Sequence, residues 1–196
     1  MTKIFRHEYD FIRIISALAV LTIHVTSIHI TTNTSAYFLN HLVRFCVPMF
    51  ILLAGLVSPN LDSEFKPIPY YKKKIKTILI PYILALSFYL LFEILFYSGC
   101  FDAIFFTKRL IYLFLHGYSH LYFLTIILQL FLLYPLIRFL YLRHSKVLIL
   151  ASFLVSLYIQ TAIFLIESKG IFIIPFTSTI PYYVTFLPYI FYFVIG

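Results

Sequence analysis

An arginine and a histidine in the first apolar run are the residues whose types and spacing could do chemistry. Arg13 and His24 lie in DFIRIISALAVLTIHVTSIHI, with ten residues between them. On a helix, eleven steps of about 100° return the two side chains to nearly the same face, about 16 Å apart along the axis. An imidazole can act as a general base toward a hydroxyl near neutral pH. Because ionisable groups inside membrane helices usually face a cavity or a partner, this pair is a candidate functional site.

Each member of the pair also has a plain structural interpretation. Arg13 alone could be a snorkelling anchor at the membrane surface, and Asp10, three residues earlier, could form a local ion pair with it. His24 alone could hydrogen-bond to a neighbouring helix, although only small threonine and serine side chains lie near it in the sequence. Both interpretations stay open from spacing alone.

A run of lysines forms the second candidate, in YYKKKIKTILIPY over residues 70–82. Lys73 and Lys76 are spaced i, i+3, so they project together from a helix end. Four lysines within five residues would attract the phosphates of a nucleotide or coenzyme. They would equally attract anionic lipid headgroups, so lipid anchoring is the alternative.

A third candidate is Arg44 in HLVRFCVPMF, at the expected outer start of the second apolar run. It could close the helix end, or it could contact an anionic or polyhydroxyl acceptor. Pro48, four residues later, is expected to kink this helix.

Four further polar residues lie in or beside later apolar runs. His116 and His120 precede the fourth run, and Glu93 and Gln129 lie inside apolar runs. Polar groups at that depth should point into the bundle, with interhelical hydrogen bonding as the structural alternative. The sequence contains no P-loop, no GxSxG, no metal-spaced His/Glu motif and no paired carboxylates, so neither a metal site nor a bound cofactor is predicted.

The elements that position these residues are membrane helices. The chain is 62% hydrophobic and 11% charged, whereas soluble domains carry about 45–50% apolar and about 25% charged residues. The composition predicts an all-α polytopic integral membrane bundle. Basic residues flank the apolar runs and do not interleave with aromatics, which argues against nucleic-acid binding despite the net charge of +8. Cys46 and Cys100 form no metal motif and are interpreted as small apolar residues, with a disulfide left open.

Six apolar runs are long enough, or nearly so, to cross a bilayer. They cover about Phe11–Ile30, Leu42–Val57, Ile78–Tyr97, Leu121–Tyr141, Val147–Ile166 and Tyr182–Gly196. Residues 103–117 carry two basic residues at their centre and are expected to form an interfacial helix. The last run is still apolar at Gly196, so the chain is interpreted as an N-terminal fragment of a longer protein.

The distribution of basic residues predicts a cytoplasmic N-terminus. With that orientation, the cytoplasmic segments hold eleven Lys and Arg residues and the outer segments hold four, as the positive-inside rule requires. The outer four are Arg44, Lys108, Arg109 and Lys169. Arg13 then lies at the cytoplasmic interface, and His24 lies in the outer half of the first helix.

With these residues identified, the chain resembles the membrane acyltransferase 3 family. The matching pieces are DFIR-x10-H at 10–24, RFCVPMFILLAG at 44–55, the basic run before ILIPY at 78–82, and HLYFL at 120–124. They occur in the family's order across all 196 residues. Within the family, the chain is most similar to the branch with poly-N-acetylglucosamine export and modification proteins.

The resemblance implies a bundle of about ten helices, of which about six are expected here, as one acyltransferase domain over residues 1–196 truncated at its C-terminal end. It implies transfer of an acyl group, acetyl or similar, from cytoplasmic acyl-CoA as co-substrate to a hydroxyl of an extracytoplasmic glycan or lipid-linked saccharide at the cell membrane.

The family's motifs also assign roles to the candidate residues. Arg13 and His24 become catalytic, and Arg44 and His120 contact the acceptor or a developing oxyanion. Lys73 and Lys76 contact the acyl-CoA phosphates, where the family carries an Arg-x-x-Arg motif. Lysine lacks the bidentate phosphate contact of arginine.

Three alternatives remain. A polysaccharide exporter or flippase would line a path with the same polar residues and transfer no acyl group. A non-catalytic membrane scaffold would tolerate loss of Arg13 and His24, and a truncated remnant would have no function. Neither the acyl group, the acceptor nor the oligomeric state follows from the sequence.

Overall fold

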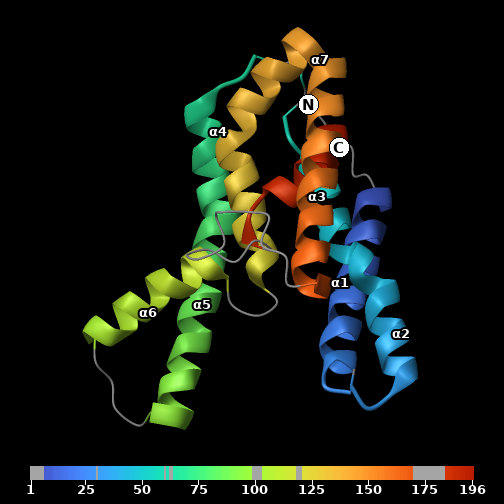
Figure 1. Ribbon diagram of the computed structural model, residues 1–196. Helices are drawn as coiled ribbons and strands as arrows, with labels where there is room; N and C mark the ends of the chain where they lie inside the picture. The colour runs from blue at the N-terminus through green and yellow to red at the C-terminus, as the bar shows by residue number, and fades with distance from the viewer. Residues whose placement is uncertain are drawn as a thin grey trace. The chain divides into compact units, whose positions relative to one another are not determined.

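The computed structural model describes residues 7–29, 31–59, 61, 64–98, 103–117, 121–169 and 184–196, and all regular structure within them is helical (Figure 1). The chain divides into two compact units, Met1–Ser58 with Phe191–Gly196, and Pro59–Ile190. Four helices are long and apolar enough to cross a membrane: His7–Ser27, Thr34–Leu56, Pro67–Phe96 and Tyr122–Leu165. The predicted all-α polytopic membrane fold is therefore confirmed.

The first unit is built on helix α1 (His7–Ser27), whose buried residues are small: Ser16, Ala19 and Thr26. They recur at three- and seven-residue intervals, so they line one face. Small side chains on that face let the neighbouring backbone approach closely, which is how membrane helices pack where no hydrophobic driving force acts between them. Helices α2 (Thr34–Leu42) and α3 (Cys46–Leu56) pack against α1.

The second crossing extends beyond its short apolar run on the N-terminal side. It starts at Thr34 instead of Leu42, because the Asn33 side chain caps the helix by accepting hydrogen bonds from the backbone N–H groups of Ser35 (2.8 Å) and Ala36 (3.3 Å). Its first two turns include polar side chains, so the run of apolar residues alone did not reveal them.

Two prolines coincide with changes in helix geometry. A 3-10 segment, η1 (Val43–Phe45), precedes Pro48, and a π-helical segment, η2 (Ile75–Leu79), precedes Pro81. A proline removes one backbone donor and clashes with the carbonyl four residues earlier, so the preceding turn must tighten or widen. Pro48 is thus preceded by a tightened turn, and the kink expected at this proline stays a prediction.

A close helix contact completes the first unit. A Cβ built on Gly55 of α3 would lie 2.4 Å from the carbonyl oxygen of Phe193 in α8 (Ile190–Ile195). No side chain fits at that distance, so glycine permits the contact.

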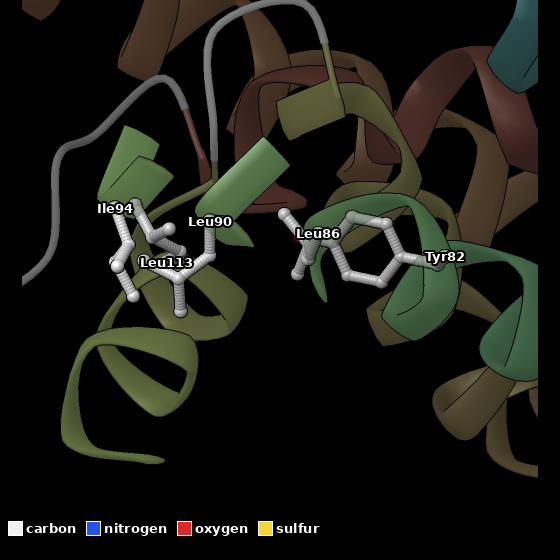
Figure 2. Close-up of a cluster of buried hydrophobic side chains, with 5 residues drawn as sticks. All are labelled: Tyr82, Leu86, Leu90, Ile94 and Leu113. Carbon is white, nitrogen blue, oxygen red and sulfur yellow. The ribbon is translucent and has the colours of Figure 1, made fainter. Parts of the chain in front are cut away.

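The second unit contains α4 (Pro67–Lys74), η2, α5 (Ile80–Glu93), η3 (Ile94–Ser98), α6 (Ala103–His116) and α7 (Tyr122–Lys169). Residues at four-residue spacing along α5 and η3 form a buried row, and Leu113 of α6 packs against it (Figure 2). The row consists of Tyr82, Leu86, Leu90 and Ile94.

Helix α6 covers the predicted interfacial segment and ends where Gly117 adopts a left-handed conformation (φ 74°). An ion pair between Arg109 of α6 and Glu93 of α5 (3.3 Å) adds to their packing. Whether α6 lies at the membrane surface stays a prediction.

Helix α7 contains both the fourth and the fifth predicted runs. The backbone at His144 is non-helical (φ −146°, ψ 58°), and the chain reverses there, so that α7 forms two arms (Figure 1). Its candidate span of 44 residues is about twice what one crossing needs. The described part of the sixth run contains only η6 (Leu187–Tyr189) and the six-residue helix α8.

Candidate functional site

Arg13 and His24 both belong to α1, as predicted. Arg13 donates to Asp10 Oδ1 at 2.6 Å, which confirms the local ion pair expected from their spacing. The two side chains of this pair are 48% and 43% exposed, so the pair contributes little to stability. His24 is half-buried.

The Arg13–His24 stripe flanks the face on which α1 packs against α2 and α3. At about 100° per residue, the centre of the buried Ser16, Ala19 and Thr26 face lies roughly 120° around the helix axis from the stripe. The stripe therefore lies away from the most deeply buried face of α1.

Arg44 is joined to α1 through a buried amide that the sequence analysis did not single out. Arg44 lies in η1, and its Nε and Nη2 both donate to Asn40 Oδ1 at 3.4 Å. Asn40 is 2% exposed, and its Nδ2 donates to the Ile23 carbonyl and to Thr26 Oγ1, both at 3.0 Å. These acceptors lie one residue before and two residues after His24, so Arg44 is connected to the turn that carries the histidine.

A sequence signal for Asn40 does exist. It lies four residues before Arg44, so on a helix the two side chains share a face. The predicted start of the helix at Leu42 excluded Asn40 from that analysis, and only the Asn33 cap extends the helix back to include it.

The lysine run of the second unit divides into inward and outward side chains. Lys74 is half-buried, with its ammonium 3.4 Å from the centre of the Phe131 ring and 5.5 Å from that of Tyr70. Lys73 and Lys76 are both exposed, and neither forms an ion pair among the described residues. Their charges are thus available to an anionic ligand or to lipid headgroups.

Aromatic packing positions this lysine-bearing helix against α7. Tyr70 is 7% exposed and stacks on Tyr134 with ring centres 5.1 Å apart. Arg138, one turn further along α7, is 9% exposed and donates to the Leu61 carbonyl at 2.7 Å. Arg138 is one of the eleven basic residues predicted to lie on the cytoplasmic side, and it also forms this structural contact.

The remaining candidates have structural contacts or lie outside the described residues. His120 lies outside them. Glu93 pairs with Arg109, and Gln129 bonds the backbone at Val184 (3.0 Å) and Phe186 (3.0 Å). His116 Nδ1 lies 2.9 Å from the Tyr112 carbonyl oxygen. For Glu93 and Gln129, these contacts match the hydrogen-bonding alternative.

The structure brings Arg44 to α1 within the first unit, whereas Lys73 and Lys76 belong to the second. In chemical terms, the first unit offers an imidazole and two guanidinium groups, which can accept a proton and stabilise negative charge on oxygen. The second unit offers paired ammonium groups suited to phosphate.

Comparison with known proteins identifies the family of the chain. The model of the acyltransferase 3 family, described as an acyltransferase domain, matches residues 6–196. The chain is similar to probable poly-beta-1,6-N-acetyl-D-glucosamine export proteins of Staphylococcus aureus. The proteins of strains MSSA476 and MW2 are each 31% identical over 166 residues, covering 80% of this chain and 45% of theirs. The protein of strain MRSA252 is 33% identical over 122 residues, covering 61% of this chain and 33% of its own.

The chain thus spans about half the length of the first two relatives, and no solved structure matches it. The family match extends over nearly the whole chain and agrees with the four apolar helices. The chain is a multi-pass membrane protein that belongs to the acyltransferase 3 family.

Proposed function

We propose that this protein transfers an acyl group, acetyl or similar, from cytoplasmic acyl-CoA to a hydroxyl of an extracytoplasmic cell-surface glycan. The observation that carries the proposal is the juxtaposition on α1: a half-buried His24, Arg13 on the same stripe, and Arg44 tied to the same turn through Asn40. Membership of the acyltransferase 3 family supports it.

In the proposed reaction, His24 acts as the general base. Its imidazole takes the proton of the glycan hydroxyl while the hydroxyl oxygen attacks the thioester carbonyl. The carbonyl oxygen becomes an oxyanion that the Arg44 guanidinium stabilises. The carbon–sulfur bond then breaks, and the thiolate of coenzyme A takes up the proton from the imidazolium, which restores His24. A variant of this route uses His24 as a transient acyl acceptor.

The donor is held at the cytoplasmic side in this proposal. Lys73, Lys76 and Arg13 contact the phosphates of acyl-CoA, and the acyl group, still bound to the thiol of coenzyme A, extends along the bundle toward His24. His120 also contacts the acceptor in this proposal, as the resemblance to the family implies. The N-terminus is cytoplasmic, and the protein lies in the cell membrane.

A second candidate is export of a surface polysaccharide without acyl transfer. The name of the Staphylococcus aureus relatives, probable poly-beta-1,6-N-acetyl-D-glucosamine export protein, is the observation that favours it. The two functions differ chemically: a transferase changes the ester content of the polymer, whereas an exporter changes only the amount that reaches the surface.

The test is the ester content of surface polysaccharide, per unit of polymer, in cells that express the protein or its His24→Ala variant. General-base catalysis contributes about 10²–10⁴-fold, so His24→Ala should lower acylation at least about a hundredfold. His29→Ala, in the exposed turn after α1, is the matched control and should leave acylation unchanged.

Unchanged ester content in the His24→Ala cells would exclude the proposed role of His24. A loss of surface polymer at constant ester content per unit polymer would instead favour export.

A further inference from the structure

Asn40 is buried to 2% exposure in a membrane-spanning helix, and every polar atom of its side chain has a partner. Burying an amide costs free energy unless its hydrogen bonds are made. The orientation of the amide follows from chemistry, because the Ile23 carbonyl can only accept and the Arg44 guanidinium can only donate. Nδ2 therefore faces α1, and Oδ1 faces Arg44.

The contacts of Asn40 differ in strength on its two sides. The bonds from Nδ2 to α1 measure 3.0 Å, an ordinary length, and Thr26 Oγ1 in turn donates to the Thr22 carbonyl at 2.7 Å. The two contacts from Arg44 measure 3.4 Å, which is long. Asn40 is thus firmly attached to α1, and its uncharged amide oxygen leaves the positive charge of Arg44 in place.

Among the residues that the structure describes, Arg44 contacts only Asn40, through Nε and Nη2. We propose that Asn40 is the positioning residue that orients the Arg44 guanidinium relative to the turn of α1 that carries His24. This inference rests on the proposed function, in which that guanidinium contacts the acceptor or the developing oxyanion.

Asn40→Leu is the sharpest substitution, because leucine is nearly the same shape as asparagine but makes no hydrogen bond. We expect it to lower the acyl-transfer kcat by roughly tenfold to a hundredfold, as the loss of an orienting partner does elsewhere, without changing the KM for acyl-CoA. Thr26→Val should give a smaller loss, and Thr26→Ser should restore wild-type transfer.

A double-mutant cycle separates positioning from a general loss of stability. If Asn40 acts through Arg44, Asn40→Leu should have no further effect on kcat in an Arg44→Ala background. Gln129→Met is the matched control, because Gln129 also uses both amide atoms but bonds the backbone of residues 184 and 186. It should leave kcat unchanged in both backgrounds. If Asn40→Leu lowers kcat as much in the Arg44→Ala background as it does in the wild type, the inference is overturned.

A second measurement does not depend on catalysis. In detergent micelles with ¹⁵N-labelled arginine, the Nε–H of Arg44, assigned by its absence in Arg44→Lys, should exchange with solvent several-fold faster in Asn40→Leu than in the wild type. Equal exchange rates would overturn the inference. A wild type without acyl transfer would contradict only the proposed function, and the exchange rates would then decide the role of Asn40.

Discussion

At the scale of residues, side chains of the same chemical type differ in the contacts that they make. Lys74 lies over aromatic rings, whereas Lys73 and Lys76 in the same run are exposed. Arg138 is buried against a loop carbonyl, whereas Arg44 is exposed and, among the described residues, contacts only Asn40. A guanidinium or ammonium group that already has a buried partner has less capacity for a ligand, so these contacts rank the candidates.

Lys73 and Lys76 provide a prediction about the donor. Replacing both by glutamine should raise the KM for acyl-CoA at least about tenfold, because each exposed charge contact contributes on the order of 1 kcal/mol. The KM for the glycan should not change. Steady-state kinetics with the donor varied measures this.

Lys72→Gln is the matched control, since it removes an exposed charge from the same run. Restoration of a low KM by the double arginine variant would support a phosphate contact. A donor KM that stays constant in the double glutamine variant would leave lipid anchoring as the role of these lysines.

At the scale of elements, the sequence predicted where helices cross but missed how they begin and bend. Apolar runs indicated the crossings, and the break near residue 144 was expected between two runs. The Asn33 cap and the reversal at a single residue, His144, depend on backbone geometry that hydropathy does not encode. The Asn40–Arg44 contact was missed for the same reason.

Gly55 provides a prediction for packing between elements. Gly55→Ala would place a methyl group 2.4 Å from the Phe193 carbonyl oxygen, so α8 must move away from α3. We expect a loss of about 1–3 kcal/mol in stability, which corresponds to a melting temperature lowered by roughly 2–12 °C. The buried thiol of Cys46 reports unfolding through a thiol-reactive dye, once Cys100 is replaced by serine.

Leu56→Ala, at the exposed neighbouring position of α3, should shift the melting temperature far less. If Gly55→Ala leaves the melting temperature at the wild-type value, α3 and α8 do not pack as closely as described.

At the scale of the whole molecule, the way two helices pair in the second unit bears on the orientation of the protein in the membrane. Tyr70 stacks on Tyr134 while the Tyr82 hydroxyl lies 2.8 Å from Thr125 Oγ1, so Pro67–Phe96 runs antiparallel to the first arm of α7. The basic residues near the start of the one helix and near the end of the first arm of α7 therefore lie at the same end of this unit. The positive-inside rule predicts that this end faces the cytoplasm.

The resulting topology can be measured from the two sides of the membrane. In a protein with both native cysteines replaced, single cysteines at Thr32, Lys108 and His144 all lie at exposed positions. A membrane-impermeant maleimide added outside the cell should label positions 32 and 108 and should not label position 144. In inverted vesicles the pattern should reverse, because the bend of α7 then faces the reagent. Labelling of position 144 from outside the cell would require the opposite orientation, and His24 would then lie in the cytoplasmic half of the membrane, away from an extracytoplasmic acceptor.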